Sequence, residues 1–203
     1  MYERFTDLAR NTMRLANEKA ALHKHEYIGT EHILLALIEI DSEGRLILYH
    51  LGLTITAIAK ELWKAVQEGP EPPRPGKLPQ TPRAKKVIEY AMEESRALKD
   101  SFVGTEHLLL GLLREEEGIA AHVLRTLGVQ IDRARDVLLQ LRNDKNRELV
   151  SVRKIAPGGL LFQLDRAHAE PAIDPEAALW EKARKGAQGI EISSIVVMGK
   201  EIT

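Results

Sequence analysis

The sequence has no cysteine among its 203 residues, which excludes disulfides, cysteine-ligated zinc, iron–sulfur clusters and thiol catalysis together. Aromatic residues are also scarce, at 4%, so a core has to be built from aliphatic side chains. No segment approaches the roughly 20 consecutive apolar residues of a membrane-spanning helix. The charged, amphipathic N-terminal segment lacks the apolar run of a signal peptide. We therefore expect a cytoplasmic protein that does not bind membranes.

A dominant sign of charge is missing as well. The chain has 29 Lys and Arg residues against 30 Asp and Glu residues, for a formal net charge of −1. This balance does not favour electrostatic binding to nucleic acid. Hydrophobic residues make up 44% of the chain, which is enough for a packed core and argues against wholesale disorder.

The signatures of common enzymes are also absent. No serine lies in a GxSxG context, and neither Gly76-Lys77 nor Gly199-Lys200 is followed by the hydroxyl residue of a phosphate-binding loop. We therefore expect no ATP hydrolysis, no catalytic residues and no cofactor. The alternative from the enzyme class is a hydrolase that uses the C-terminal segment.

An internal repeat organises the first two thirds of the chain. A shift of 75 residues places YIGTEHILL, residues 27–35, on FVGTEHLLL, residues 102–110. Farther along, residues 51–53 match residues 127–129 at a shift of 76, while Gly44 matches Gly118 at a shift of 74. A shared GTEH tetrapeptide inside matching apolar patterns indicates a duplication.

The first copy is predicted to form four short helices. A GTEH segment with Thr30 as N-cap leads into residues 33–38, which are apolar on every side and so predict a helix buried all round. A third helix is expected over residues 44–51, and Thr54 is expected to cap a fourth. The first helix shows apolar or small residues at helical spacing, namely Phe5, Leu8, Ala9, Thr12 and Ala16.

The second copy repeats this plan. Thr81 is the predicted cap of its first helix, with Pro82 at the first helical position. Further helices are expected over residues 106–114, 119–127 and 131–141. The two four-helix units are expected to pack together, because neither is large enough to bury its apolar faces alone.

Composition changes mark the boundaries between domains. Prolines concentrate in GPEPPRPGKLPQTP, which excludes helix and favours an extended tether between the copies. The expected fold is mainly α, with two tandem four-helix repeats and a small α+β C-terminal appendage. We predict repeat 1 over residues 1–68, a linker over 69–80, repeat 2 over 81–142 and a strand-rich extension over 143–203.

The extension is predicted from short apolar segments and turn residues. Strands are expected at residues 149–152 and 160–164, around the turn Pro157-Gly158-Gly159, with a helix at 174–185 and a last strand at 190–197. A piece of this size is marginal alone. It is therefore expected to pack on the helices or on another chain, which would make a homo-oligomer.

Several motifs together resemble one known family. They are Phe5-Thr6, the two copies of GTEHxLL, TPRAKKVIE at 81–89 and LLREEEGIAA at 112–121. In these motifs residues 1–142 resemble the repeated N-terminal domain of Clp ATPases, also called the Clp R domain, of the ClpC type. The resemblance implies a pseudo-twofold pair of four-helix units that docks adaptors and captures substrates, here as a stand-alone copy without AAA+ modules. The first copy departs from the family at residues 44–49, where GRLILY replaces the usual Gly-Ile-Ala-Ala.

Glu31 and Glu106 are the leading candidates for ligand contacts. A carboxylate in the first turn of a helix complements the helix dipole, which is a purely structural explanation. The resemblance implies more, because the glutamate of each GTEH motif contacts the guanidinium of phosphoarginine in ClpC-type domains. A carboxylate can accept two hydrogen bonds from a guanidinium, and helix-start amides can hold phosphoryl oxygens.

Two further groups of polar residues are weaker candidates. Thr30 and Thr105 adjoin the glutamates and are interpreted first as helix caps and second as ligand contacts. Arg83, Lys85 and Lys86 form a small basic patch, which is either a solvated face or a site that docks an adaptor or contacts a phosphate.

We do not expect the histidines to bind a metal ion. His32 and His107 follow the glutamates and are expected to pack or hydrogen-bond between helices. His23 and His25, near His32, form the one local histidine cluster of the sequence, which we interpret as a solvated helix end.

The sequence therefore predicts a non-enzymatic interaction protein. It is expected to bind a Clp ATPase, its adaptors or its substrates, including phosphoarginine-marked ones, and to modulate regulated proteolysis. The alternative is a module that recognises peptides or modified residues independently of the Clp machine. Retention on a Clp ATPase separates these two hypotheses.

Overall fold

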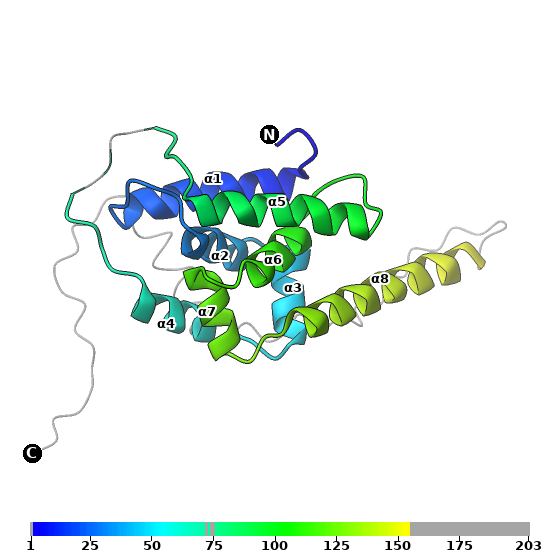
Figure 1. Cartoon of the computed structure of the whole chain (residues 1–203). Helices are drawn as coiled ribbons and strands as arrows, with labels where there is room; N and C mark the ends of the chain where they lie inside the picture. Colours follow the sequence, from blue (N-terminus) through cyan, green and yellow to red (C-terminus); the bar gives the residue numbers. More distant parts are fainter. Residues whose placement is uncertain (1, 72, 74–75, 155–203) are drawn as a thin grey trace, which may run out of the picture. The chain divides into compact units, whose positions relative to one another are not determined.

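The computed structural model describes residues 2–71, 73 and 76–154, and that part of the chain contains eight helices (Figure 1). The predicted mainly α fold with two four-helix repeats is confirmed. None of these helices is long and apolar enough to cross a membrane. The first repeat contains α1 (Asp7–Leu22), α2 (Thr30–Glu39), α3 (Glu43–His50) and α4 (Ile55–Ala65). The second contains α5 (Pro82–Ala97), α6 (Thr105–Arg114), α7 (Ile119–Thr126) and α8 (Ile131–Lys154).

Threonine side chains begin three of the helices. Thr6, Thr54 and Thr81 each accept a hydrogen bond from the backbone N–H three residues later, at 3.2, 3.1 and 3.1 Å. Each bond satisfies one of the N–H groups that have no partner within the helix. Pro82 follows Thr81 at the first helical position, where its missing N–H has no consequence. The predicted caps at Thr54 and Thr81 are confirmed.

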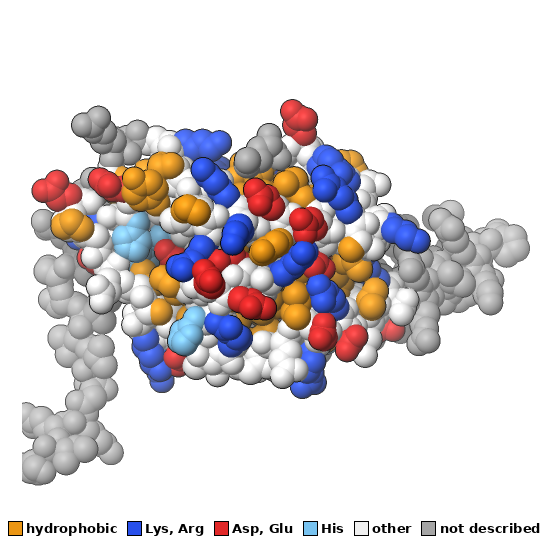
Figure 2. Space-filling view, viewed as in Figure 1, with side chains coloured by type: hydrophobic (Ala, Val, Ile, Leu, Met, Phe, Trp, Pro, Cys, Tyr) orange, Lys and Arg blue, Asp and Glu red, His pale blue; other side chains and the backbone are white. Residues whose placement is uncertain are grey.

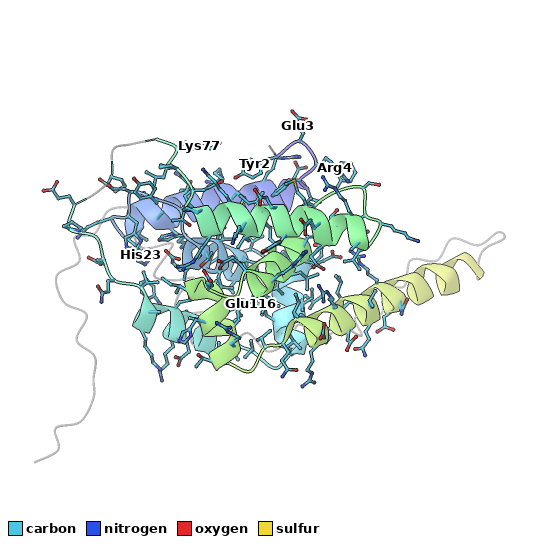
Figure 3. All side chains as sticks on the ribbon, in the orientation of Figure 1. Tyr2, Glu3, Arg4, His23, Lys77 and Glu116 are labelled. Atoms are coloured by element: carbon cyan, nitrogen blue, oxygen red, sulfur yellow. The ribbon has the colours of Figure 1, made fainter. Side chains whose placement is uncertain are left out.

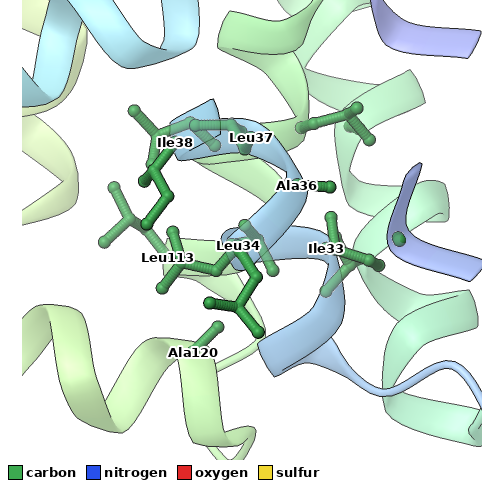
Figure 4. Packing of buried hydrophobic residues seen from close by; sticks show 14 of the residues in the cluster. Ile33, Leu34, Ala36, Leu37, Ile38, Leu113 and Ala120 are labelled. Atoms are coloured by element: carbon green, nitrogen blue, oxygen red, sulfur yellow. The ribbon is translucent and has the colours of Figure 1, made fainter. Parts of the chain in front are cut away.

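The central helices α2 and α6 are apolar on every side and lie inside the structure. Every residue from Ile33 to Ile38 is at most 5% exposed. Figure 4 shows Leu113 of α6 and Ala120 of α7 packed near Leu34 of α2. One hydrophobic core therefore spans both repeats, as their small size predicts.

The repeats interlock through two short backbone pairings. Phe5, before α1, forms a parallel bridge with Val103, before α6, and Ile28, before α2, forms one with Gln80, before α5. A shift of 75 residues converts one bridge into the other. Backbone hydrogen bonds of 2.7 to 3.0 Å hold both bridges. Each repeat thus positions the start of a helix of the other.

The end of the proline-rich linker is attached to the first repeat. Leu78 is 8% exposed, and its N–H donates to the Asn17 Oδ1 atom at 2.7 Å. The Asn17 side-chain amide also donates to the Gly76 carbonyl oxygen at 3.2 Å. The last residues of the linker therefore pack on α1 and place Thr81 at the start of α5.

Two sequence predictions about elements are wrong. The expected strand at residues 149–152 is part of α8, which continues to Lys154. No glycine or proline interrupts the helix before Pro157, so the sequence contains no signal that would end it earlier. Leu8, expected on the buried face of α1, is 48% exposed, and Met13 occupies that face instead. The other expected elements of the extension, at 160–164, 174–185 and 190–197, lie outside the described residues.

Candidate functional site

Each GTEH motif starts a central helix by a capping arrangement that uses its glycine and its histidine. Gly29 and Gly104 are the N-cap residues, and each donates its N–H to Nδ1 of the histidine three residues later, at 2.9 Å. His32 and His107 are fully buried by this arrangement. The prediction that Thr30 caps its own helix is therefore wrong, because glycine already occupies that position.

The two motif threonines instead cap helices of the opposite repeat. Thr30 Oγ1 accepts from the Ala120 N–H at 3.3 Å, at the start of α7. Thr105 Oγ1 accepts from the Gly44 N–H at 3.1 Å, at the start of α3. Both threonines are buried, at 3% and 2% exposure. Each hydroxyl thus accepts a hydrogen bond from a helix start of the opposite repeat.

Glycine is required where these helices approach the motifs. A Cβ atom at Gly44 would lie 2.7 Å from the Thr105 carbonyl oxygen, and a Cβ atom at Gly118 would lie 2.6 Å from Thr30 Oγ1. The Thr105 carbonyl is a backbone group and cannot yield that space without moving a helix, and the Thr30 hydroxyl could yield it only by leaving the Ala120 N–H. The close approach brings the start of α3 against the start of α6, and the start of α7 against the start of α2.

A hollow of about 460 Å³ opens where the starts of α1, α3 and α6 converge. We call it the Glu106 pocket. The N-terminal ends of helices carry partial positive charge, and here they meet the carboxyl groups of Asp41, Glu43 and Glu106. The lining residues are Thr6, Leu8, Asp41, Ser42, Glu43, Leu46, Gly104, Thr105 and Glu106.

Glu106 is a buried carboxyl group, at 7% exposure. Burial raises the pKa of its carboxyl to about 7, and the negative charges of Glu43 and Asp100 act in the same direction, against its own backbone N–H and Arg142. Arg142 lies 3.7 Å from Glu106 Oε1 but 2.5 Å from Asp100 Oδ2, so it pairs mainly with Asp100. The Glu106 carboxylate is consequently short of compensating positive charge.

His107 does not supply that compensation. Its Nδ1 atom lies 3.1 Å from Glu106 Oε1, but this nitrogen already accepts the Gly104 N–H and so has no proton to donate. Its Nε2 atom lies 2.9 Å from Asp100 Oδ2. Burial lowers the pKa of the His107 ring, which favours the neutral form.

The internal repeat predicts an equivalent site around Glu31. The residues at the equivalent positions, which we call the Glu31 site, are Glu31, Arg83, Glu115 and Glu117. Shifts of 75 and 74 residues align these four with Glu106, Leu8, Asp41 and Glu43 of the Glu106 pocket. Glu31 is half-buried, with a side-chain exposure of 12%. Arg83 contacts Glu117 Oε2 at 3.3 Å and Glu115 Oε1 at 3.7 Å.

The basic patch is divided between two places. Lys85 and Lys86 are exposed on α5, but Lys85 lines a second hollow with Tyr2 and Lys77. Lys77 lies 5.7 Å from the Tyr2 ring centroid, and both are labelled in Figure 3. On the face shown in Figure 2, basic and acidic side chains alternate without a patch of one sign. Of the three patch residues, Arg83 is the one that contacts Glu115 and Glu117.

The histidine cluster is not the solvated helix end that the sequence predicts. His23 is 4% exposed and His32 is fully buried, while His25 is half-buried. His25 Nδ1 lies 2.9 Å from His32 Nε2, and His25 Nε2 lies 2.5 Å from the Gln67 carbonyl oxygen. Burial lowers the pKa of His32 to about 3, with smaller contributions from His25 and His23, so its ring stays neutral.

This cluster has the residue types of a metal site but not the right protonation. His25, Glu31 and His32 offer ligand atoms within 4.8 Å of one another. However, His32 Nδ1 accepts the Gly29 N–H, so its proton lies on Nε2 and is donated to His25. A metal ion would bind His32 through the Nε2 lone pair, but the proton already occupies that position. The cluster is therefore best explained as a chain of hydrogen bonds.

Sequence reasoning missed Asp41, Ser42 and Glu43 as pocket residues. They lie before and at the start of α3 in the first repeat but surround the glutamate of the second repeat. The departure at residues 44–49 therefore affects the Glu106 pocket rather than a site of its own copy. The glycines that follow the two motifs, Gly44 and Gly118, indicate that a close helix contact exists at the starts of α3 and α7. Their spacing does not tell which repeat each of these helices contacts.

The observations define a two-repeat helical domain in which each GTEH motif contacts the start of a helix of the other repeat. The family description "Clp repeat (R) N-terminal domain" matches residues 4–127 and again residues 102–164. The chain belongs to this family, which confirms the resemblance seen in its motifs.

Curated relatives are large proteins of the Clp group. The chaperone protein ClpB of Oceanobacillus iheyensis is 46% identical over 143 residues, and the negative regulator of genetic competence ClpC/MecB of Bacillus subtilis is 48% identical over 143 residues. Each alignment covers 70% of this chain but 17% of the relative. The chain thus spans less than a fifth of the length of the relatives it matches.

Solved structures have the same fold. The N-terminal domain of the chaperone ClpD from Arabidopsis thaliana has a TM-score of 0.56 at 24% identity, over 70% of this chain and 97% of that one. The Hsp104 N-terminal domain from Candida albicans has a TM-score of 0.58 at 22% identity, over 69% of this chain and 92% of that one. At these identities the likeness concerns the fold alone.

Proposed function

We propose that this chain is a non-enzymatic binding domain that captures segments of the substrates or adaptors of a Clp ATPase and thereby modulates regulated proteolysis. The observation that carries the proposal is the Glu106 carboxyl group, buried at the meeting point of three helix starts. Among the described residues, its nearest guanidinium is 3.7 Å away and engaged with Asp100. The Glu106 carboxylate can therefore bind a cationic group of another molecule.

The chemistry of the pocket favours a guanidinium as the captured group. A guanidinium donates two parallel hydrogen bonds to a carboxylate, which gives both affinity and a fixed orientation. A phosphoryl group attached to that guanidinium could accept hydrogen bonds from helix-start N–H groups beside it. Glu106 and Glu31 are therefore proposed to bind arginine side chains, including phosphoarginine, in extended or unfolded segments.

The partner is inferred from the relatives. Several of them are named as ATP-binding subunits of the ATP-dependent Clp protease, in which the matching segment is a small part of a larger chain. A domain of this kind acts on proteolysis by holding a segment of a substrate or adaptor. Binding of the Clp ATPase itself is a second contact that the same domain could make.

Two measurements test this function. The first is titration of an arginine peptide and its phosphoarginine form into the wild-type chain, Glu31→Gln, Glu106→Gln and the double variant. We expect the double variant to lose binding, while Glu93→Gln, an exposed glutamate of α5, keeps it. Equal affinity in the double variant would overturn the assignment of both glutamates.

The second measurement is recovery of the tagged chain from its own cell extract, with bound proteins identified by mass spectrometry. Clp ATPase or protease subunits in stoichiometric amount support a regulator of that machine. Recovery without any Clp subunit contradicts the Clp link and leaves a module that recognises modified or exposed segments independently.

A further inference from the structure

The turn between α1 and α2 holds the residues that follow α4 and lead into the linker. Gly69 donates its N–H to the His23 carbonyl oxygen at 2.9 Å, and the Lys24 side chain pairs with Glu68 Oε2 at 3.2 Å. A Cβ atom at Gly69 would lie 1.9 Å from the Lys24 carbonyl oxygen, so a larger residue would not fit without moving the backbone. We call residues 66–69 the docked segment.

One histidine side chain joins the docked segment to the buried ring of His32. His25 Nε2 lies 2.5 Å from the Gln67 carbonyl oxygen, and His25 Nδ1 lies 2.9 Å from His32 Nε2. On the far side, His32 Nδ1 accepts the N–H of Gly29, the N-cap of α2. A continuous line of hydrogen bonds therefore runs from the start of α2 to the docked segment.

The groups at the two ends of this line allow a single arrangement of its protons. The Gly29 N–H can only donate, so neutral His32 carries its proton on Nε2 and donates it to His25. The Gln67 carbonyl oxygen can only accept, so neutral His25 carries its proton on Nε2 and accepts with Nδ1. Each ring has one proton, and each proton is already in a hydrogen bond.

A second proton on His25 breaks this arrangement. It would occupy Nδ1, where it would face the N–H of His32 Nε2 at 2.9 Å, as one donor against another. His32 does not reverse, because its Nδ1 atom accepts the Gly29 N–H and burial lowers the pKa of its ring to about 3. Protonated His25 must therefore turn away from His32, and in doing so it leaves the Gln67 carbonyl oxygen.

The charges around His25 do not prevent this loss. The titratable and charged groups that face it are His23 at the end of α1, Glu31 and His32 of α2, and the Lys24–Glu68 pair beside the docked segment. From α4, the uncharged ring of Trp63 packs against His23. A protonated ring that turns towards the Glu31 carboxylate gains an ion pair, but it gives up both hydrogen bonds of the line.

In the second repeat an aspartate takes the place of this histidine. A shift of 75 residues places Asp100 at the position of His25 and His107 at the position of His32. Asp100 Oδ2 lies 2.9 Å from His107 Nε2, so a carboxylate accepts the N–H that His25 accepts in the first repeat. Between about pH 5 and 8 an ordinary histidine changes its charge and an ordinary aspartate does not. The pH-dependent contact is therefore specific to the first repeat.

We propose that His25 is a pH-sensitive latch, which holds the docked segment at neutral to alkaline pH and releases it on acidification. Release frees residues 66–69 from the turn between α1 and α2. The last residues of the linker stay attached, because Leu78 donates its N–H to Asn17 Oδ1, a contact without a titratable group. Acid thus loosens the start of the linker while the eight helices stay folded.

Linkage gives the size of the effect. A histidine released from such a line takes up a proton at the ordinary pKa of about 6.5, whereas the docked arrangement has no position for that proton. At about pH 5, which is about 1.5 units lower, protonation therefore favours the released state by about thirtyfold. At about pH 7.5 the same ring is mostly neutral, and the docked state is favoured.

Hydrogen exchange of the ¹⁵N-labelled chain at about pH 7.5 and about pH 5 tests this proposal. The protection factor, which corrects for the intrinsic pH dependence of exchange, is measured for the N–H groups of Gly69 and Leu78. We expect the protection of Gly69 to fall by about thirtyfold at the lower pH, while Leu78 keeps its protection. The ring signals of His25 should titrate with the same midpoint as the Gly69 signal.

Three variants identify the responsible group. His25→Gln keeps one acceptor and one donor but does not titrate, so Gly69 should stay protected at about pH 5. His25→Arg carries a permanent charge and should give low protection of Gly69 at both pH values. His122→Gln, which removes an exposed histidine of α7, is the matched control and should behave as the wild type.

Three results would overturn the proposal. The first is equal protection of Gly69 at the two pH values. The second is a fall in protection that persists in a folded His25→Gln chain, because release would then depend on another group such as His23 or Glu68. The third is loss of protection at Leu78 together with Gly69, which would mean that the domain unfolds as a whole. If His25→Gln does not fold, different midpoints for the His25 ring and the Gly69 signal in the wild type would overturn it equally.

Discussion

Replacement of Glu106 by glutamine should make the fold more stable at neutral to alkaline pH while it abolishes ligand binding. Burial raises the pKa of this carboxyl to about 7, from an ordinary value of 4.5. A raised pKa means that the folded chain disfavours the ionised form relative to the unfolded chain. Glutamine has nearly the same shape as the protonated carboxyl and never ionises, so it removes that penalty.

The magnitude follows from the pKa. A difference of about 2.5 units, at 1.36 kcal/mol per unit, gives about 3 kcal/mol of stability lost by the wild type once Glu106 is ionised. The penalty is absent below about pH 4.5, grows between about pH 4.5 and 7, and is fully present above about pH 7. The advantage of Glu106→Gln should follow the same course and reach about 3 kcal/mol at about pH 8.

Urea unfolding at about pH 5 and about pH 8 measures this difference. The control is Glu93→Gln, whose side chain is 49% exposed and paired with Arg114, and which should change the free energy of unfolding by less than about 0.5 kcal/mol. Equal or lower stability of Glu106→Gln at the higher pH would refute the reasoning. It would mean that the carboxylate is already compensated inside the fold and is not kept for a ligand.

Three further predictions concern the interlocked framework. Thr30→Val and Thr105→Val should each lower the free energy of unfolding by about 1 kcal/mol, because each leaves a helix start of the opposite repeat without its cap; urea unfolding of the single and double variants measures this. Gly44→Ala should lower the free energy of unfolding by about 2 kcal/mol or more, because the added Cβ would lie 2.7 Å from the Thr105 carbonyl oxygen. Unchanged stability of this variant in urea unfolding would contradict the account. The pKa of His32 is lowered to about 3, so its neutral ring contributes stability above about pH 6.5 that is lost as pH falls towards about 3. His32→Gln should flatten the loss of stability between those two pH values, and an unchanged slope would contradict this.

The helices could be predicted from the sequence because their signals are local. Thr81-Pro82 marks the start of α5, and the unbroken apolar run of residues 33–38 marks a helix buried on all sides. The continuation of α8 through residues 149–152 was missed because short β-branched runs favour strand locally, whereas an uninterrupted helix simply continues.

The candidate site could be predicted only in part, because it is assembled between repeats. The GTEH motifs predict Glu31 and Glu106 as ligand contacts, which stays a prediction, and both residues lie at the starts of buried helices. Thr30, however, caps α7 of the other repeat, a contact that no local spacing encodes. His23 was misjudged for the same reason, since the packing that buries it involves Trp63 of α4, whose ring centroid is 5.0 Å away.

Calorimetric titration of an arginine-containing peptide and its phosphoarginine form into the wild type and Glu31→Gln/Glu106→Gln, at about pH 8, tests the central claim most directly. We predict saturable binding to the wild type and none to the double variant, with the variant still folded by circular dichroism. Undiminished binding to a folded double variant would show that the glutamates of the GTEH motifs are structural and that the ligand is held elsewhere.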